Sequence, residues 1–173
     1  MKKFLLIVFL FFMAVSPCFS QSLRWQNFPL TVYIEFHPKK ATVKQAFTTW
    51  QSLTRIAKFK YVNSEDADII VKFTSTPQID KSSQDPHLAG YTSYTYTNGY
   101  LNKAVITILS TRPGSTVQAS DKYVYMVALH EIGHALGLPH SKNSNDVMYY
   151  PYSTQLLISP NDVNAFKALY SDN

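Results

Sequence analysis

The segment from His130 to His140, HEIGHALGLPH, constrains this chain more than any other part of its sequence. On a helix, the spacing of His130 and His134 puts their side chains one above the other on the same face. Gly137 follows three residues later, and glycine readily adopts the left-handed backbone conformation that ends a helix. The pattern predicts a helix that breaks at Gly137, after which the chain returns His140 toward the two earlier imidazoles.

The three histidines are candidate ligands of a single metal ion. Three nitrogen ligands with a free fourth position describe a catalytic zinc site, whereas four protein ligands close a structural one. Glu131 adjoins the first ligand, and the glutamate of an HExxH motif acts as the general base toward water. The third histidine makes the pattern far more specific than HExxH alone. We therefore predict one catalytic Zn²⁺ held by His130, His134 and His140, with Glu131 as the catalytic residue.

The start of the chain has the order of a secretory signal. Lys2 and Lys3 precede an apolar run from Phe4 to Val15, and small polar residues follow near Ser20. This sequence of charged, apolar and small polar parts is typical of a signal peptide. The apolar run is shorter than the roughly 20 residues that span a bilayer comfortably. An uncleaved membrane anchor is the alternative interpretation.

We expect residues 1–20 to be the signal peptide and residues 21–173 to form one catalytic domain of a secreted protein, either extracellular or periplasmic. Cys18 is the one cysteine of the chain, so the mature domain should contain no disulfide. A lipid anchor at Cys18 is an open alternative, although Pro17 disfavours it. Otherwise we expect no membrane association once the signal is removed.

Charge argues against nucleic acid as a partner. The formal net charge is +5, and two of the lysines lie in the expected signal peptide. The remaining basic residues are scattered and form no long run, so a solvated surface of mixed charge is expected. Nothing in the sequence indicates oligomerisation, and we expect a monomer.

Periodicity predicts an α+β domain with a mixed sheet. The expected strands are residues 30–36, 58–62, 68–73, 90–97 and 103–109, and the expected helices are residues 42–57, 121–136 and 160–170. Asn98-Gly99 is a hairpin turn signal. Thr42 with Gln45 fits a capping box, Asp121 can cap the second helix, and Ser159 can cap the third.

HEIGHALGLPH followed by Ser141 resembles the signature of the matrixins, a family of metzincin zinc metalloproteases. Met148 falls where matrixins place the methionine of the Met-turn, which lies beneath the zinc; a lone methionine would otherwise be ordinary core. The resemblance implies the zincin fold, with a twisted mixed sheet, an active-site helix, a Met-turn and a C-terminal helix. It also implies an endopeptidase that acts on extended protein or peptide segments.

The sequence departs from the animal matrixins in two respects. Residues 21–29 contain no cysteine, so we expect no cysteine-switch propeptide and a resemblance to minimal bacterial forms. Only His37 and His87 lie outside the motif, too few for the structural zinc that many matrixins hold through three histidines. Calcium binding is possible, but no motif supports it.

The resemblance also suggests substrate-binding residues. Met126, one turn before His130, matches the position that tunes pocket depth in matrixins, although it could be ordinary helix core. Strand 103–109 is expected to form the sheet edge beside the cleft. Tyr150, Pro151 and Tyr152 are tentative pocket residues, and Tyr150 could instead contact the zinc or the oxyanion.

Asp162 has two compatible interpretations. It lies three residues after Ser159 and can complete a capping box, and by resemblance it matches an aspartate that braces the Met-turn.

The function predicted from sequence is a secreted zinc-dependent endopeptidase. A zinc hydrolase acting on a non-protein amide, such as a cell-wall component, is the alternative, because the same zinc chemistry serves both. A non-catalytic binding module is disfavoured because Glu131 is retained.

Overall fold

The computed structural model describes residues 23–75, 89–150 and 153–171. The expected signal peptide, His87, Pro151 and Tyr152 lie outside these ranges. Along the chain the elements are β1 (Leu30–Ile34), α1 (Lys40–Thr54), β2 (Phe59–Tyr61), β3 (Ile69–Thr74), β4 (Gly90–Thr97), β5 (Tyr100–Leu109), α2 (Asp121–Ala135) and α3 (Pro160–Leu169).

One five-stranded sheet, ordered β2-β1-β3-β5-β4, supports the domain. Neighbouring strands run parallel except for β4, which is antiparallel to β5. Asn98 and Gly99 form the turn between β4 and β5 with φ values of 51° and 83°, as the hairpin signal predicted. The mixed sheet and the α+β class expected from the sequence are therefore confirmed.

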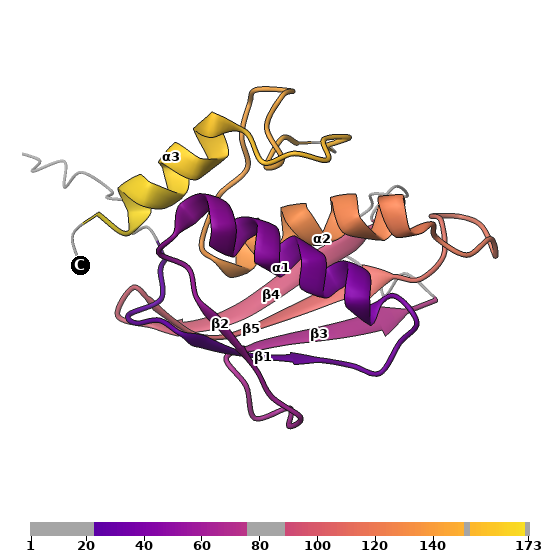
Figure 1. Cartoon of the computed structure of the whole chain (residues 1–173), viewed down its shortest axis with the longest axis horizontal. Coiled ribbons are helices and arrows are strands. Elements are labelled where there is room, and N and C mark those ends of the chain that lie inside the picture. Colours follow the sequence, from indigo (N-terminus) through magenta and orange to yellow (C-terminus); the bar gives the residue numbers. More distant parts are fainter. Residues whose placement is uncertain (1–22, 76–88, 151–152, 172–173) are drawn as a thin grey trace, which may run out of the picture.

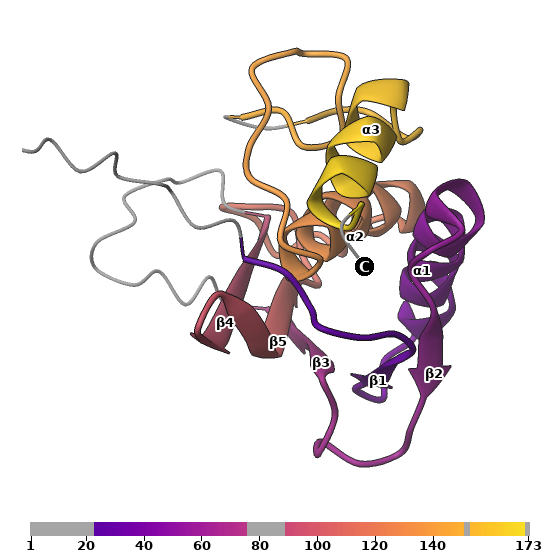
Figure 2. The ribbon, with the colours of Figure 1, turned by 90° about the vertical axis from the view of Figure 1, so that its left-hand side faces the viewer.

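Helices α1 and α2 cover the same face of the sheet, and α3 lies farther from the sheet than α2 does (Figures 1 and 2). Alternate residues of β1, including Val32 and Ile34, are buried beneath the helices. Trp50 and Phe47 of α1 are fully buried in the same core. Burying a large apolar side chain stabilises the fold by about 1.5–3 kcal/mol. The indole N–H of Trp50 donates to the carbonyl of Leu129 at 2.9 Å, which fixes α1 against α2.

Two helix starts differ from the sequence prediction. Helix α1 begins at Lys40 without a side-chain cap, and the Thr42 hydroxyl instead donates to Asp121 at 3.2 Å. Helix α2 is capped by Ser120, whose hydroxyl accepts from the backbone N–H of Tyr123. Asp121 is the first residue of α2 and pairs with Lys39 at 2.9 Å. The expected capping roles of Thr42 and Asp121 are wrong because both side chains are engaged in contacts between elements.

The expected sheet edge is also wrong. Residues 103–109 belong to β5, which lies between β3 and β4 with partners on both sides. The edge strand beside α2 is β4. The expectation followed the family resemblance, whereas the apolar residues at the end of β5 and the polar, exposed residues of β4 agree with β5 as the inner strand and β4 as the edge.

None of the described helices is long and apolar enough to cross a membrane.

Candidate active site

Helix α2 carries two of the three histidines on one face. The Nε2 atoms of His130 and His134 lie 3.1 Å apart. The Nδ1 atom of His130 lies 2.7 Å from the carbonyl oxygen of Val147, and that of His134 lies 2.9 Å from the carbonyl oxygen of Leu138. A carbonyl oxygen can only accept, so both rings carry their proton on Nδ1 and present an unprotonated Nε2.

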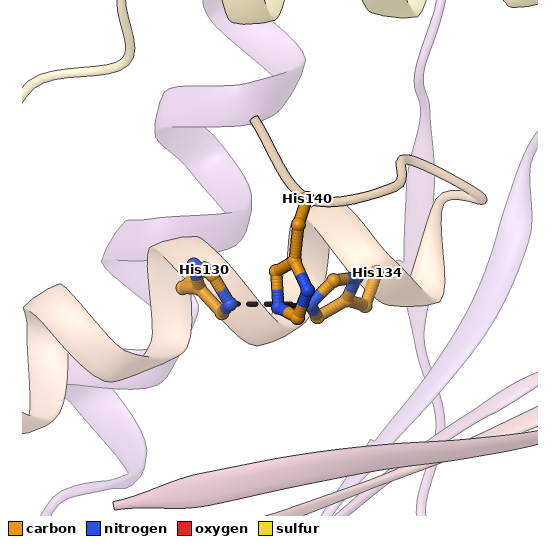
Figure 3. Close-up of side chains that lie close together, drawn as sticks. All are labelled: His130, His134 and His140. Atoms are coloured by element: carbon orange, nitrogen blue, oxygen red, sulfur yellow. Dashed lines mark hydrogen bonds between the residues drawn. The ribbon is translucent and has the colours of Figure 1, made fainter. Parts of the chain in front are cut away.

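The third histidine arrives through a turn at Gly137. The φ of Gly137 is 94°, a left-handed backbone conformation that residues with a side chain rarely adopt. Its N–H donates to the carbonyl of His134 at 2.8 Å, and the chain then reverses. His140 Nε2 consequently lies 3.1 Å from His134 Nε2, and the three rings converge on one point (Figure 3). The helix, break and return predicted from the motif are all present.

These histidines fit a zinc ion. All three can offer a ligand nitrogen within one cluster. Two nitrogens bound to a tetrahedral zinc at about 2.0–2.1 Å lie roughly 3.3 Å apart, close to the Nε2 separations here. The Nε2 atoms of His130 and His134 are both unprotonated, so neither can donate a hydrogen bond to the other. Their short separation therefore suits two ligands of one shared cation. Burial is the main cause that lowers the pKa of each of the three histidines, to about 4 for His134, which keeps them available as ligands.

Glu131 is buried between α2 and β4, where its side chain contacts Gly90 and Thr92 of β4. Only 6% of its surface is exposed. The Thr92 hydroxyl lies 2.8 Å from Glu131 Oε2 and donates to it. Burial raises the pKa of Glu131 to about 7, and the hydrogen bond from Thr92 acts in the opposite direction. A divalent cation held by the neighbouring imidazoles would favour the carboxylate further.

The predicted Met-turn packs against α2, the helix that carries His130 and His134. The N–H of Ser141 donates to the carbonyl of Met148, and the N–H of Tyr150 donates to the carbonyl of Ser141 at 3.3 Å. Met148 is buried and packs against α2 at Gly133, where an added Cβ would overlap the methionine sulfur.

Asp162 braces this turn from α3. Its carboxylate accepts from the N–H groups of Val147 at 2.8 Å and Met148 at 3.3 Å. The same carboxylate accepts from the N–H of Ser159, and the Ser159 hydroxyl accepts from the N–H of Asp162, which completes a capping box. Both contacts anticipated for Asp162 are therefore made by one buried side chain.

Sequence reasoning missed two residues of this region. Thr92 contacts Glu131 across 39 residues of chain. Asp146 is a buried carboxylate that accepts from the hydroxyls of Ser141 and Ser159, and so joins the loop after His140 to the start of α3.

The tentative pocket residues lie as follows. Met126 is partly buried on α2 and packs against the core, so its position suits both core and pocket wall. Tyr150 is 56% exposed, and its ring centroid lies 4.8 Å from that of His140. Pro151 and Tyr152 lie outside the described residues.

Comparison with known proteins decides the family. The family model described as Matrixin matches residues 19–171. The chain belongs to the matrixin family. Matrixins are zinc metalloendopeptidases, and the predicted catalytic zinc is confirmed by this membership together with the three converging histidines.

Several curated matrixins resemble this one. Interstitial collagenase of Sus scrofa is 27% identical over 168 residues, which cover 85% of this chain and 33% of the collagenase. Matrix metalloproteinase-15 of Homo sapiens is 31% identical over 142 residues, covering 72% of this chain and 21% of that protein. Matrix metalloproteinase-26 of Homo sapiens is 28% identical over 162 residues, covering 86% of this chain and 60% of that protein. The chain thus spans about a third of the length of the collagenases it matches.

Proposed function

We propose that this matrixin is an exported zinc-dependent endopeptidase with Glu131 as its general base. One observation carries the proposal: the imidazoles of His130, His134 and His140 converge on one point, and the buried carboxyl group of Glu131 follows the first of these histidines on α2. A metal-binding module would need the histidines alone, whereas hydrolysis also needs a base next to the metal.

The residues divide the work between them. His130, His134 and His140 would hold the zinc, which supplies Lewis-acid chemistry for amide hydrolysis when bound. Glu131 takes a proton from the attacking water and passes it to the leaving amine nitrogen. Burial suits Glu131 to both tasks, because it raises the pKa of the carboxyl toward neutrality.

The substrate proposed is a protein or peptide in extended conformation. Strand β4 is the last strand of the sheet and lies against α2. Its outer edge can pair with an extended peptide through main-chain hydrogen bonds, while side-chain pockets provide specificity. Tyr150, beside His140, and Met126 are proposed to line the main pocket, together with Pro151 and Tyr152. The exposed Tyr150 ring suits a pocket wall.

From the sequence we also propose that the protein is exported and monomeric. The charged, apolar and polar order of residues 1–20 supports a signal peptide. The name of one relative, interstitial collagenase, is consistent with a secreted or periplasmic location.

The test is cleavage of a diverse peptide library by the purified protein, with and without a chelator, compared with Glu131→Ala. We expect cleavage that the chelator abolishes and added zinc restores. Glu131→Ala should lose at least about a hundredfold in rate while still binding one zinc ion, because Glu131 is not a ligand. If no peptide is cleaved and a non-protein amide is hydrolysed instead, the endopeptidase proposal fails.

A further inference from the structure

Thr92 is the described residue that donates a hydrogen bond to the Glu131 carboxylate. It lies on β4, where the strand passes over α2, and is itself only partly exposed. Its hydroxyl oxygen lies 2.8 Å from Glu131 Oε2 and 3.0 Å from the backbone carbonyl oxygen of the same glutamate. A hydroxyl has one proton to donate, and an ionised carboxylate is the stronger acceptor of the two.

The backbone of β4 is built to come this close. A Cβ at Gly90 would lie 2.8 Å from a Val127 methyl carbon and 3.2 Å from Glu131 Cγ. Glycine at this position lets the strand pack directly against α2. Residues 90 and 92 face the same side of the strand. Gly90 leaves room for the Glu131 side chain, and the Thr92 hydroxyl donates to its carboxylate.

A hydrogen bond at Oε2 has a definite effect on Glu131. The terminal torsion of a free glutamate side chain is broadly distributed, and nothing in an HExxH helix by itself fixes the plane of the carboxylate. A donor from β4 fixes one oxygen and leaves Oε1 to face the reacting water. Misplacement of a reacting group by about 1 Å can cost on the order of a hundredfold in rate.

We propose that Thr92 is a positioning residue, which holds Glu131 through Oε2 so that Oε1 is aligned for proton transfer. The inference rests on the proposed function of Glu131. The competing explanation is that the hydroxyl merely ties β4 to α2 through the backbone carbonyl.

Substitutions at Thr92 separate these explanations. Thr92→Val keeps the shape of the side chain and removes the hydroxyl, and Thr92→Ser keeps the hydroxyl and removes the methyl group. Thr92→Ala supplies a second variant without the hydroxyl if valine disturbs folding. Thr48→Val is the matched control, because Thr48 is exposed on α1 and its hydroxyl donates within its own helix.

The experiment measures kcat and KM on one cleaved peptide, with zinc content and folded fraction determined for each variant. We expect Thr92→Val and Thr92→Ala to lower kcat about ten- to a hundredfold while KM changes little and one zinc stays bound. Thr92→Ser should restore most of the rate, and Thr48→Val should match the unsubstituted protein.

Two results would overturn the inference. One is a fully folded, zinc-loaded Thr92→Val protein with unchanged kcat; the other is a loss of rate that follows loss of zinc or of folded protein. Both outcomes leave the proposed function intact if the unsubstituted protein cleaves peptides and Glu131→Ala does not. Absence of cleavage by the unsubstituted protein would overturn both proposals together.

Discussion

Gly133 illustrates how one small residue shapes the metal site. It lies between His130 and His134 on α2, and an added Cβ would overlap Met148 Sδ and approach the Trp50 ring. The absence of a side chain therefore lets Met148 of the Met-turn pack directly against α2 between the two ligands. In an exposed helix the same glycine would simply cost stability relative to alanine.

Gly133→Ala should destabilise the protein by about 1–3 kcal/mol, because the extra methyl group overpacks the contact with Met148. The measurement is denaturant-induced unfolding. In a Met148→Ala background the same substitution should cost much less, since the overlapping sulfur is gone. Equal costs in the two backgrounds would show that this contact does not explain the glycine.

At this scale the sequence predicts the ligands but not their partners. The spacing of the histidines and Gly137 is local: helix geometry puts His130 and His134 on one face, and the turn at Gly137 returns His140 to them. Thr92 and Asp146 act through contacts that depend on strand pairing and loop packing. No local pattern distinguishes Thr92 from the other threonines of β4.

Among the elements, the Met-turn depends on the start of α3. The Asp162 carboxylate accepts from two N–H groups of the turn and one at its own helix start. Because Val147 also accepts from His130 Nδ1, the brace extends from α3 through the turn to a zinc ligand.

Asp162→Asn should destabilise the protein by about 2–4 kcal/mol, because an amide replaces one accepting oxygen with a donor that faces buried N–H groups. Zinc affinity should also fall, by about ten- to a hundredfold. Unfolding titrations and zinc competition measure the two effects. The matched control is Asp121→Asn, at an exposed carboxylate, which should alter zinc affinity little. Unchanged zinc affinity in Asp162→Asn would show that the contacts of Asp162 do not support the metal site.

Elements were predictable where their signals are local. The hairpin at Asn98-Gly99 and the cap at Ser159 follow from short-range chemistry, and both were predicted. The placement of β4 at the edge, and the use of Ser120 rather than Asp121 as the cap of α2, depend on neighbours distant in sequence.

For the molecule as a whole, the two ends of the described chain meet on the active-site helix. Trp25 donates through its indole N–H to the carbonyl of Ala135 at 2.7 Å. The Tyr170 hydroxyl donates to the carbonyl of Leu136 at 2.9 Å and accepts from the N–H of Trp25 at 3.1 Å. Arg24 donates to the carbonyl of Leu169. Residues near both ends of the described chain thereby enclose the last turn of α2.

This junction should make stability sensitive to alkaline pH. Burial raises the pKa of Tyr170 to about 12, above the value of about 10 in an unfolded chain. The folded protein keeps the phenol proton longer than the unfolded chain does, so the stabilisation is complete below about pH 10 and is lost as pH rises toward 12. We expect a loss of about 1–3 kcal/mol over that interval.

The measurement is the free energy of unfolding from pH 8 to 11.5, with Tyr170→Phe as the comparison. The variant should be less stable at pH 8 but should lose less with rising pH. Parallel curves for the two proteins would exclude Tyr170 as the source.

The enclosure of α2 also bears on how the protein folds. Trp25 and Tyr170 are separated by 145 residues, and contacts of such separation carry a high loop-closure entropy. Contacts of this kind form slowly in small domains. Gly137, which returns His140 to the cluster, packs against the backbone of Leu23. We therefore expect the full three-histidine ligand set to assemble late, and high-affinity metal capture to report on the final steps of folding.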